Sequence, residues 1–252
     1  MKASQEIREA LARVAELRQV ASQPGDLALA LQAVKHLQAQ RFAGTYADLL
    51  GSPMFSPSAT FFLEELYSAK DYSDRDAQFS RIAGTIERTF PESVISTVTA
   101  LARLHRLTEE LDLAMARHWC QADSTSAAAR YITCWRAVNQ REDRNWQLAT
   151  VLQIGQSLGK LTRKPGLRLL LKMMRRPAEL AGLGSLQAFL ESGFDHFCGM
   201  AKSGQVDTFL TTIRARESGW IDRLFDADPA TCVAELTQTL PLAPNPLSPI
   251  AT

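Results

Sequence analysis

Nearly every long segment of this 252-residue chain repeats its apolar residues with the period of an α-helix, and none alternates cleanly in twos as a β-strand does. In residues 3–21, for example, Ile7, Leu11, Val14 and Leu17 follow one another every three or four positions. Such residues lie on one side of a helix, where they can pack against a neighbour. The periodicity predicts an all-α fold, a bundle of about nine or ten helices.

Glycine and proline residues mark the ends of the predicted helices. Pro24 and Gly25 separate the first helix from a second one that ends near Gln40, and the short link predicts an antiparallel hairpin. The chain is expected to form a single all-helical domain over residues 1–226. Its three parts are a helical hairpin, a loop containing glycines and prolines, and the main bundle, at residues 1–40, 41–57 and 58–226.

Two glycines lie one helical turn apart in the helix predicted from about Arg141 to Leu161. Gly155 and Gly159 share one side of that helix and leave it without side chains. A second helix is therefore expected to cross closely at this smooth face.

A C-terminal extension is expected after the bundle, from residue 227 to residue 252. Its last dozen residues, PLAPNPLSPIAT, contain four prolines, which cannot continue a helix because proline has no amide proton to donate. The segment also lacks aromatic side chains that could pack against the bundle. This Pro-rich tail is therefore expected to be disordered.

Composition and charge narrow the class of protein. The net charge is +1, so the chain as a whole is not suited to binding nucleic acid, and nucleic acid is not expected as a partner. The N-terminus has no apolar run typical of a secretory signal, and no apolar segment approaches the roughly 18 residues that a membrane span needs. The four cysteines form no CxxC pair and match no zinc framework. A cytoplasmic protein with free thiols is expected.

Ligand patterns for metal and haem, and patterns for catalysis, are missing from the sequence. His196 and Met200 share a helical face, but Cys198 between them points away, so the three cannot converge on one ion. There is no HExxH, no ExxH pair of the di-iron type and no GxSxG. We expect no cofactor, no metal site and no catalytic residue, which favours a non-enzymatic protein.

The stretch FFLEELYSAKDYSDRD, residues 61–76, is unusually dense in charged and aromatic side chains. Ser73 and Asp76 have the spacing of a capping box, which predicts that they cap the helix that follows. Asp74 in the first turn suits the helix dipole. Local structure accounts for these three residues and leaves the other charged groups of the stretch to be explained.

Four polar residues near this stretch have no local explanation: Tyr67, Asp71, Arg75 and Arg81. One hypothesis gathers them into a polar pocket for an anionic or hydroxylated ligand, because a guanidinium can bind a carboxylate or phosphate through two hydrogen bonds. The alternative is a helix junction held by ordinary ion pairs. The sequence leaves both interpretations open.

The same stretch, together with Arg81 and Ile82, resembles the signature of an uncharacterised proteobacterial all-helical family: FFLxxLY, a short link, then an arginine–aspartate pair. Residues 173–197 and 209–217 resemble further parts of that pattern, so the resemblance covers most of residues 50–220. Ser68 departs from it, because glycine is expected after the tyrosine. The resemblance implies a single helical domain of bacterial origin, and the family has no known activity to carry over.

A second candidate is the basic segment 160–176, in a stretch with no acidic residue between Arg144 and Ala178. Helical spacing places its cations and its apolar residues on opposite faces. The first set is Arg168, Lys172, Arg175 and Arg176, and the second is Leu167, Leu170, Leu171 and Met174. The segment is either an anionic-surface binder or an ordinary bundle helix with a solvated basic face.

These patterns favour a cytoplasmic, non-enzymatic interaction or regulatory domain that holds a small ligand between its helices. Its partner would be another protein or an anionic small molecule. Two alternatives stay open: an enzyme or ligand sensor with the polar pocket, and a binder of anionic surfaces through the basic helix. The sequence does not determine the oligomeric state.

Overall fold

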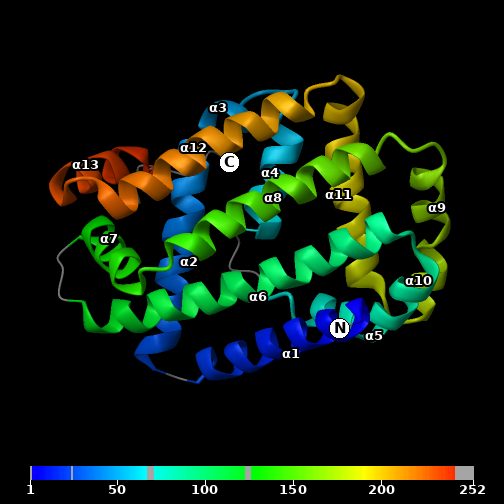
Figure 1. Ribbon diagram of the computed structural model, residues 1–252, viewed down its shortest axis with the longest axis horizontal. Helices are drawn as coiled ribbons and strands as arrows, with labels where there is room; N and C mark the ends of the chain where they lie inside the picture. The colour runs from blue at the N-terminus through cyan, green and yellow to red at the C-terminus, as the bar shows by residue number, and fades with distance from the viewer. Residues whose placement is uncertain (1, 24, 67–70, 123–125, 242–252) are drawn as a thin grey trace, which may run out of the picture.

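The computed structural model describes residues 2–23, 25–66, 71–122 and 126–241, and the described chain is all-helical, as its periodicity predicts (Figure 1). It contains thirteen helices in that part of the chain, where nine or ten were expected. They are α1 (Ala3–Ala21), α2 (Asp26–Thr45), α3 (Ala47–Leu50), α4 (Ser56–Leu66), α5 (Ser73–Thr89), α6 (Glu92–Gln121), α7 (Ala127–Val138), α8 (Arg141–Leu161), α9 (Leu167–Met173), α10 (Arg175–Leu180), α11 (Gly184–Lys202), α12 (Val206–Asp226) and α13 (Pro229–Thr239).

Four long helices form the frame of the molecule. In Figure 1, α1, α6, α8 and α12 lie side by side, and each successive pair is in contact. The helices α2 and α11 cross this row near its two ends, α2 against α6 and α11 against α8. With 30 residues, α6 is the longest helix, and it contacts α1, α2, α7 and α8. No helix in the described part of the chain is long and apolar enough to cross a membrane.

The first two helices do not pack together as the predicted hairpin. Each packs against α6, and they make few contacts with one another. In Figure 1, α1 runs along α6 whereas α2 rises across it. The two helices therefore diverge, and the space between them is the candidate site described below.

The segment 41–57, expected to be a loop, is largely helical. Helix α2 continues to Thr45, and the short α3 follows it. The physical reason is core packing: the rings of Phe42 and Tyr46 are fully buried, with their centroids 4.5 Å apart. Burying two aromatic rings outweighs the low helix propensity of Gly44.

Two further differences concern the end of the chain. Residues 229–239, expected to lie in an extension, form α13, which packs on α7 and α2 and buries Cys232 and Leu236 completely. Residues 242–252 of the predicted Pro-rich tail lie outside the described residues.

The predicted close crossing at Gly155 and Gly159 is confirmed, and the partner of α8 there is α12. A Cβ atom at Gly155 would lie 2.6 Å from a methyl carbon of Leu210. One at Gly159 would lie 2.9 Å from a methyl carbon of Val206. Neither position has room for a side chain, so the glycines set the distance between these two frame helices.

Candidate functional site

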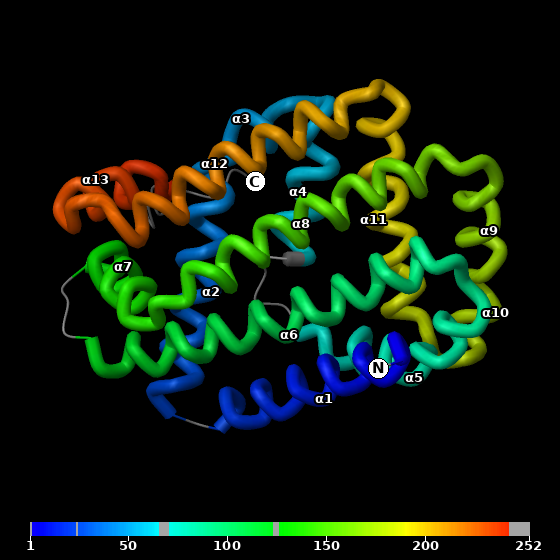
Figure 2. The backbone as a smooth tube through the Cα atoms, viewed as in Figure 1, coloured from blue at the N-terminus to red at the C-terminus, as the bar shows by residue number. Residues whose placement is uncertain are grey.

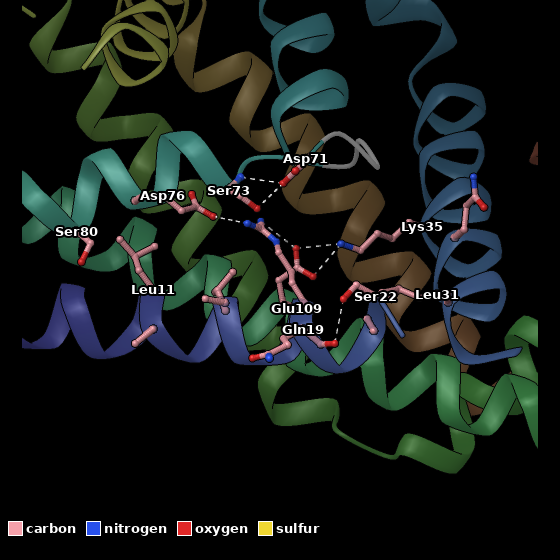
Figure 3. A pocket seen from close by; sticks show the side chains of 18 residues that line it. Leu11, Gln19, Ser22, Leu31, Lys35, Asp71, Ser73, Asp76, Ser80 and Glu109 are labelled. Atoms are coloured by element: carbon pink, nitrogen blue, oxygen red, sulfur yellow. Dashed lines mark hydrogen bonds and ion pairs between the residues drawn. The ribbon is translucent and has the colours of Figure 1, made fainter. Parts of the chain in front are cut away.

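A cavity of about 790 Å³ lies between α1, α2 and the start of α5, with Glu109 of α6 in its lining (Figure 3). Its volume is within the range of small-molecule pockets. Leu11, Val14 and Leu31 provide apolar wall. The polar lining includes charged groups and amides or hydroxyls: Arg18, Gln19, Ser22, Gln32, Lys35, Asp71, Ser73, Asp76, Ser80 and Glu109.

Arg18 connects two of the three carboxylates that line the cavity. Its Nη1 donates a hydrogen bond to Oδ2 of Asp76 at 2.8 Å, and its Nη2 lies 3.5 Å from Oε1 of Glu109. The three side chains come from α1, α5 and α6, so the guanidinium ties three helices together at the cavity wall.

Lys35 on α2 completes the charged wall. Its ammonium group donates hydrogen bonds to both carboxylate oxygens of Glu109, each at 2.9 Å, as the dashed lines of Figure 3 show. Both side chains are mostly shielded from solvent. The contact bridges α2 to α6 at the carboxylate that also lies beside Arg18.

These ion pairs keep both carboxylates ionised. Burial acts to raise the pKa of Asp76, but the hydrogen bond from His105, its charge and the charges of Arg75 and Arg18 outweigh it, and the pKa lies below its ordinary value. Burial likewise opposes the charge of Glu109, and Lys35 outweighs it, so that pKa is also lowered. The cavity wall therefore carries permanent charges at neutral pH.

His105 contacts the network without being part of the cavity lining. Its Nε2 lies 2.8 Å from Oδ2 of Asp76 and 3.1 Å from Nη2 of Arg18. A single ring nitrogen cannot donate to the carboxylate and accept from the guanidinium at once. With the proton on Nε2, the ring donates to Asp76, and its contact with the guanidinium is then not a hydrogen bond.

The predicted capping box at the start of α5 is wrong. Tyr72 is at the N-cap position and makes no side-chain capping bond, while Oδ1 of Asp71 accepts hydrogen bonds from the amide of Ser73 at 2.9 Å and from the Ser73 hydroxyl at 2.5 Å. Asp76 turns instead toward Arg18 and is buried. A partly buried cation on a neighbouring helix attracts the carboxylate more strongly than a solvated helix end does.

The three described residues of the predicted polar pocket make separate contacts. Asp71 lines the cavity. Arg75 pairs with Glu65 at 3.1 Å, and its guanidinium lies over the rings of Tyr72 and Phe189. Arg81 is exposed and donates a hydrogen bond to the carbonyl oxygen of Gly182. Tyr67 lies outside the described residues.

The predicted basic face is divided as well. Arg168 pairs with Asp195 at 2.8 Å, and Nε of Arg175 donates to both carboxylate oxygens of Glu191 at 3.0 Å, so both cations are bound to α11. Lys172 and Arg176 are exposed. Of the expected apolar face, Leu167 and Leu171 are partly buried, whereas Leu170 and Met174 face solvent.

Sequence reasoning missed Arg18, Lys35 and Glu109, and did not place Asp76 in this cavity. One signal was available on α6, where His105, Glu109 and Asp112 follow at intervals of four and three on a single helical face. Charged residues repeated at this spacing beside an apolar stripe indicate a buried polar face.

Among the described residues, no group of three or more acidic, histidine or cysteine side chains could hold a metal ion.

Comparison with known proteins gives one result. A family model described as a domain of unknown function (DUF8198) matches residues 17–231. The match spans α2 to α12 entirely, with the last residues of α1 and the first of α13. The comparisons with curated proteins and with solved structures found no match.

Proposed function

Because the chain belongs to the DUF8198 family, whose description assigns no activity, we propose from the geometry that it is a non-enzymatic regulatory domain that binds one small molecule between α1, α2 and α5. The observation that supports this is the meeting of four ionised side chains from four helices at one cavity: Arg18, Lys35, Asp76 and Glu109. Burying such charges costs free energy that an apolar core would avoid, and such clusters concentrate at functional sites.

The lining indicates the chemical class of the ligand. The apolar wall suits a hydrocarbon body. The described lining carries two cations, Arg18 and Lys35, against the three carboxylates of Asp71, Asp76 and Glu109. Because the carboxylates outnumber the cations, the lining favours a ligand head group that is neutral or singly positive and repels an anionic one.

The protonation of the site favours binding over catalysis. A general acid or base works best with a pKa near the working pH. The pKa values of Asp76 and Glu109 are instead lowered, and both carboxylates already accept hydrogen bonds from neighbouring cations. Their chemistry is that of stationary charges that orient a ligand.

The position of the cavity explains how binding could regulate the protein. Helices α1 and α2 contact one another little, so a ligand between them adds contacts that the empty bundle lacks. A ligand that binds only the folded state raises its stability in proportion to the logarithm of its concentration. Occupancy would therefore tighten the N-terminal side of the bundle.

Two parts of the proposal rest on other observations. The four cysteines are free, which supports the expected cytoplasmic location. The earlier hypothesis of a polar pocket at Tyr67, Asp71, Arg75 and Arg81 remains a separate proposal, supported only by the place of Asp71 in the cavity lining.

The test compares three probes with the same hydrocarbon chain: hexylamine, hexanol and hexanoate. Thermal unfolding is followed with each probe, and native mass spectrometry of the purified protein reports any retained small molecule. We expect hexylamine and hexanol to raise the melting temperature and hexanoate to leave it unchanged. If none of the three raises it and the protein carries no retained molecule, the proposal is wrong.

A matched pair of variants locates the binding. Ala15 is exposed and lines the cavity, so Ala15→Trp fills the space with an indole ring. Ala137 is exposed on α7, away from the cavity, and Ala137→Trp is the control. The response to hexylamine should disappear in Ala15→Trp and persist in Ala137→Trp. An equal response in both variants would place the probe elsewhere.

A further inference from the structure

Exposed apolar side chains concentrate at one end of the molecule. Of the eleven large hydrophobic residues that are exposed in the described chain, five lie in α9, α10 and the turn between them: Leu169, Leu170, Met173, Met174 and Leu180. Leu180 is 91% exposed and Met173 is 66% exposed. Figure 2 shows these two helices at the end of the long axis opposite α7 and α13. Exposed apolar groups gathered in this way mark a binding surface.

Helix α9 leaves several apolar side chains in solvent. Its cation Arg168, like Arg175 at the start of α10, pairs with an acidic residue of α11, although both arginine side chains stay exposed. Its apolar residues Leu169 and Met173 face outward, and every residue of α9 stays at least partly exposed. Exposing Leu169 and Met173 loses the stabilisation that their burial would give, and ion pairs as exposed as these contribute little in return.

Free positive charge accompanies the apolar side chains. Lys164, Lys172 and Arg176 are exposed, and none of them forms an ion pair with any described residue. Glu179 is the one acidic residue between positions 160 and 183. The face therefore combines apolar side chains with unneutralised cations.

We propose that the α9–α10 face binds an anionic lipid bilayer. Leu169, Met173 and Leu180 would insert among the acyl chains, while Lys172 and Arg176 would bind phosphate and carboxylate head groups. A second copy of the chain fits less well, because a two-fold contact would bring the cations of both copies together. The inference is independent of the small-molecule cavity, which lies between α1, α2 and α5.

The experiment is flotation of the full-length protein with vesicles of phosphatidylcholine, with or without about 30 mol % phosphatidylserine. We expect the protein to float only with the anionic vesicles. Raising the salt concentration from about 0.1 M to about 0.5 M should release most of it, because salt screens the attraction of exposed cations to the surface.

Two double variants separate the charged and apolar contributions. Lys172→Gln with Arg176→Gln should lower the partition coefficient about 25-fold, since each cation near an anionic surface is worth about fivefold. Leu169→Gln with Met173→Gln should lower it at least about tenfold and leave the salt dependence unchanged. All four side chains are exposed, so circular dichroism melting curves should match the wild type.

Matched controls carry the same substitutions elsewhere. Lys202→Gln with Arg214→Gln removes two exposed cations, and Leu29→Gln removes a leucine that is as exposed as Leu169. Each control should change the partition coefficient less than about twofold. Losses in the controls equal to those of the α9–α10 variants would overturn the assignment of this face.

Three further outcomes would overturn the proposal. The first is a wild-type protein that does not float with anionic vesicles, or floats equally with neutral ones. The second is a wild-type protein that binds no vesicles and that light scattering shows to be a dimer, which Leu169→Gln with Met173→Gln converts to a monomer. The face would then be an interface between two copies of the chain. The third is binding to polyglutamate in the absence of vesicle binding, which indicates an acidic polypeptide instead.

Discussion

The guanidinium of Arg41 donates two parallel hydrogen bonds to the carboxylate of Glu217, from Nη1 at 3.1 Å and from Nη2 at 2.8 Å. The pair joins α2 to α12 and is buried at both ends. The Tyr46 hydroxyl donates to the same carboxylate at 2.9 Å. Helix α2 therefore makes two separate charged contacts, with α12 through Arg41 and with α6 through Lys35.

Removing the cation of this pair should be strongly destabilising. Arg41→Met leaves the Glu217 carboxylate buried without its main partner, which should lower the free energy of unfolding by about 3–5 kcal/mol. Urea denaturation measures the change. The control is Arg13→Met, which breaks an exposed pair with Glu16 and should cost less than about 1 kcal/mol. Equal losses in the two variants would show that burial does not strengthen the Arg41 contact.

Acid should weaken the protein through Asp76 and Glu109. Both pKa values are lowered on folding, so the unfolded chain binds more protons at moderately acid pH. The stability that these groups contribute is present above their ordinary pKa values of about 4 and is lost as pH falls through the lowered ones. Asp76→Asn should therefore flatten the fall of the free energy of unfolding below about pH 4.

Asp112 should act with the opposite sign. Burial raises its pKa, although Gln38 donates a hydrogen bond to it at 3.0 Å. A raised pKa contributes stability at low pH that is lost as pH rises through the folded value. Asp112→Asn should therefore steepen the gain in stability with rising pH, as measured by urea denaturation at several pH values. The same slope in both asparagine variants would contradict the pair of predictions.

Gly44 should tolerate no side chain. A Cβ atom at this position would lie 1.7 Å from the carbonyl oxygen of Thr239, so Gly44→Ala has to displace the end of α13. We expect a loss of about 1–3 kcal/mol in the free energy of unfolding. The control is Gly199→Ala on α11, where a Cβ meets nothing within 4 Å and alanine should gain about 0.5–1 kcal/mol. Thermal unfolding of the two variants should shift in opposite directions.

One cysteine should react in the folded protein. Cys120 is exposed, whereas Cys134, Cys198 and Cys232 are buried. Burial raises the pKa of Cys134 to about 11 and also raises that of Cys232, which leaves little thiolate at either site. N-Ethylmaleimide should add one adduct to the native chain, by mass spectrometry, and none to Cys120→Ser. Rapid labelling of a second thiol would mean that the bundle opens more readily than the burial of that thiol implies.

Much of the fold could be predicted because helix formation is governed by local spacing. The stripe of Ile7, Leu11, Val14 and Leu17 is buried in α1 as expected, and the glycines of α8 meet α12. The helix count was too low because short helices such as α3 lack a full period of sequence pattern. The prediction of a loop at 41–57 is wrong because it rests on the glycines and prolines and leaves out the packing of Phe42 and Tyr46.

The candidate site could be predicted only in part. Asp71 was singled out and does line the cavity. Arg18, Lys35 and Glu109 were not, because each lies within a helix, where a charged residue is expected to face solvent. Asp76 was assigned to a cap on the strength of its spacing from Ser73, whereas its partner Arg18 is 58 positions away.

The amino-acid pattern was enough to establish helices, most of their core faces and the lack of a membrane-length apolar run, since these follow from neighbours a few positions apart. Tertiary packing alone decided that α1 and α2 diverge around a cavity, that Arg41 meets Glu217, and that α9 exposes Leu169 and Met173. A helix has the same periodicity whichever way it is turned. Its orientation depends on many small contacts between distant segments, and these exist only once the chain has folded.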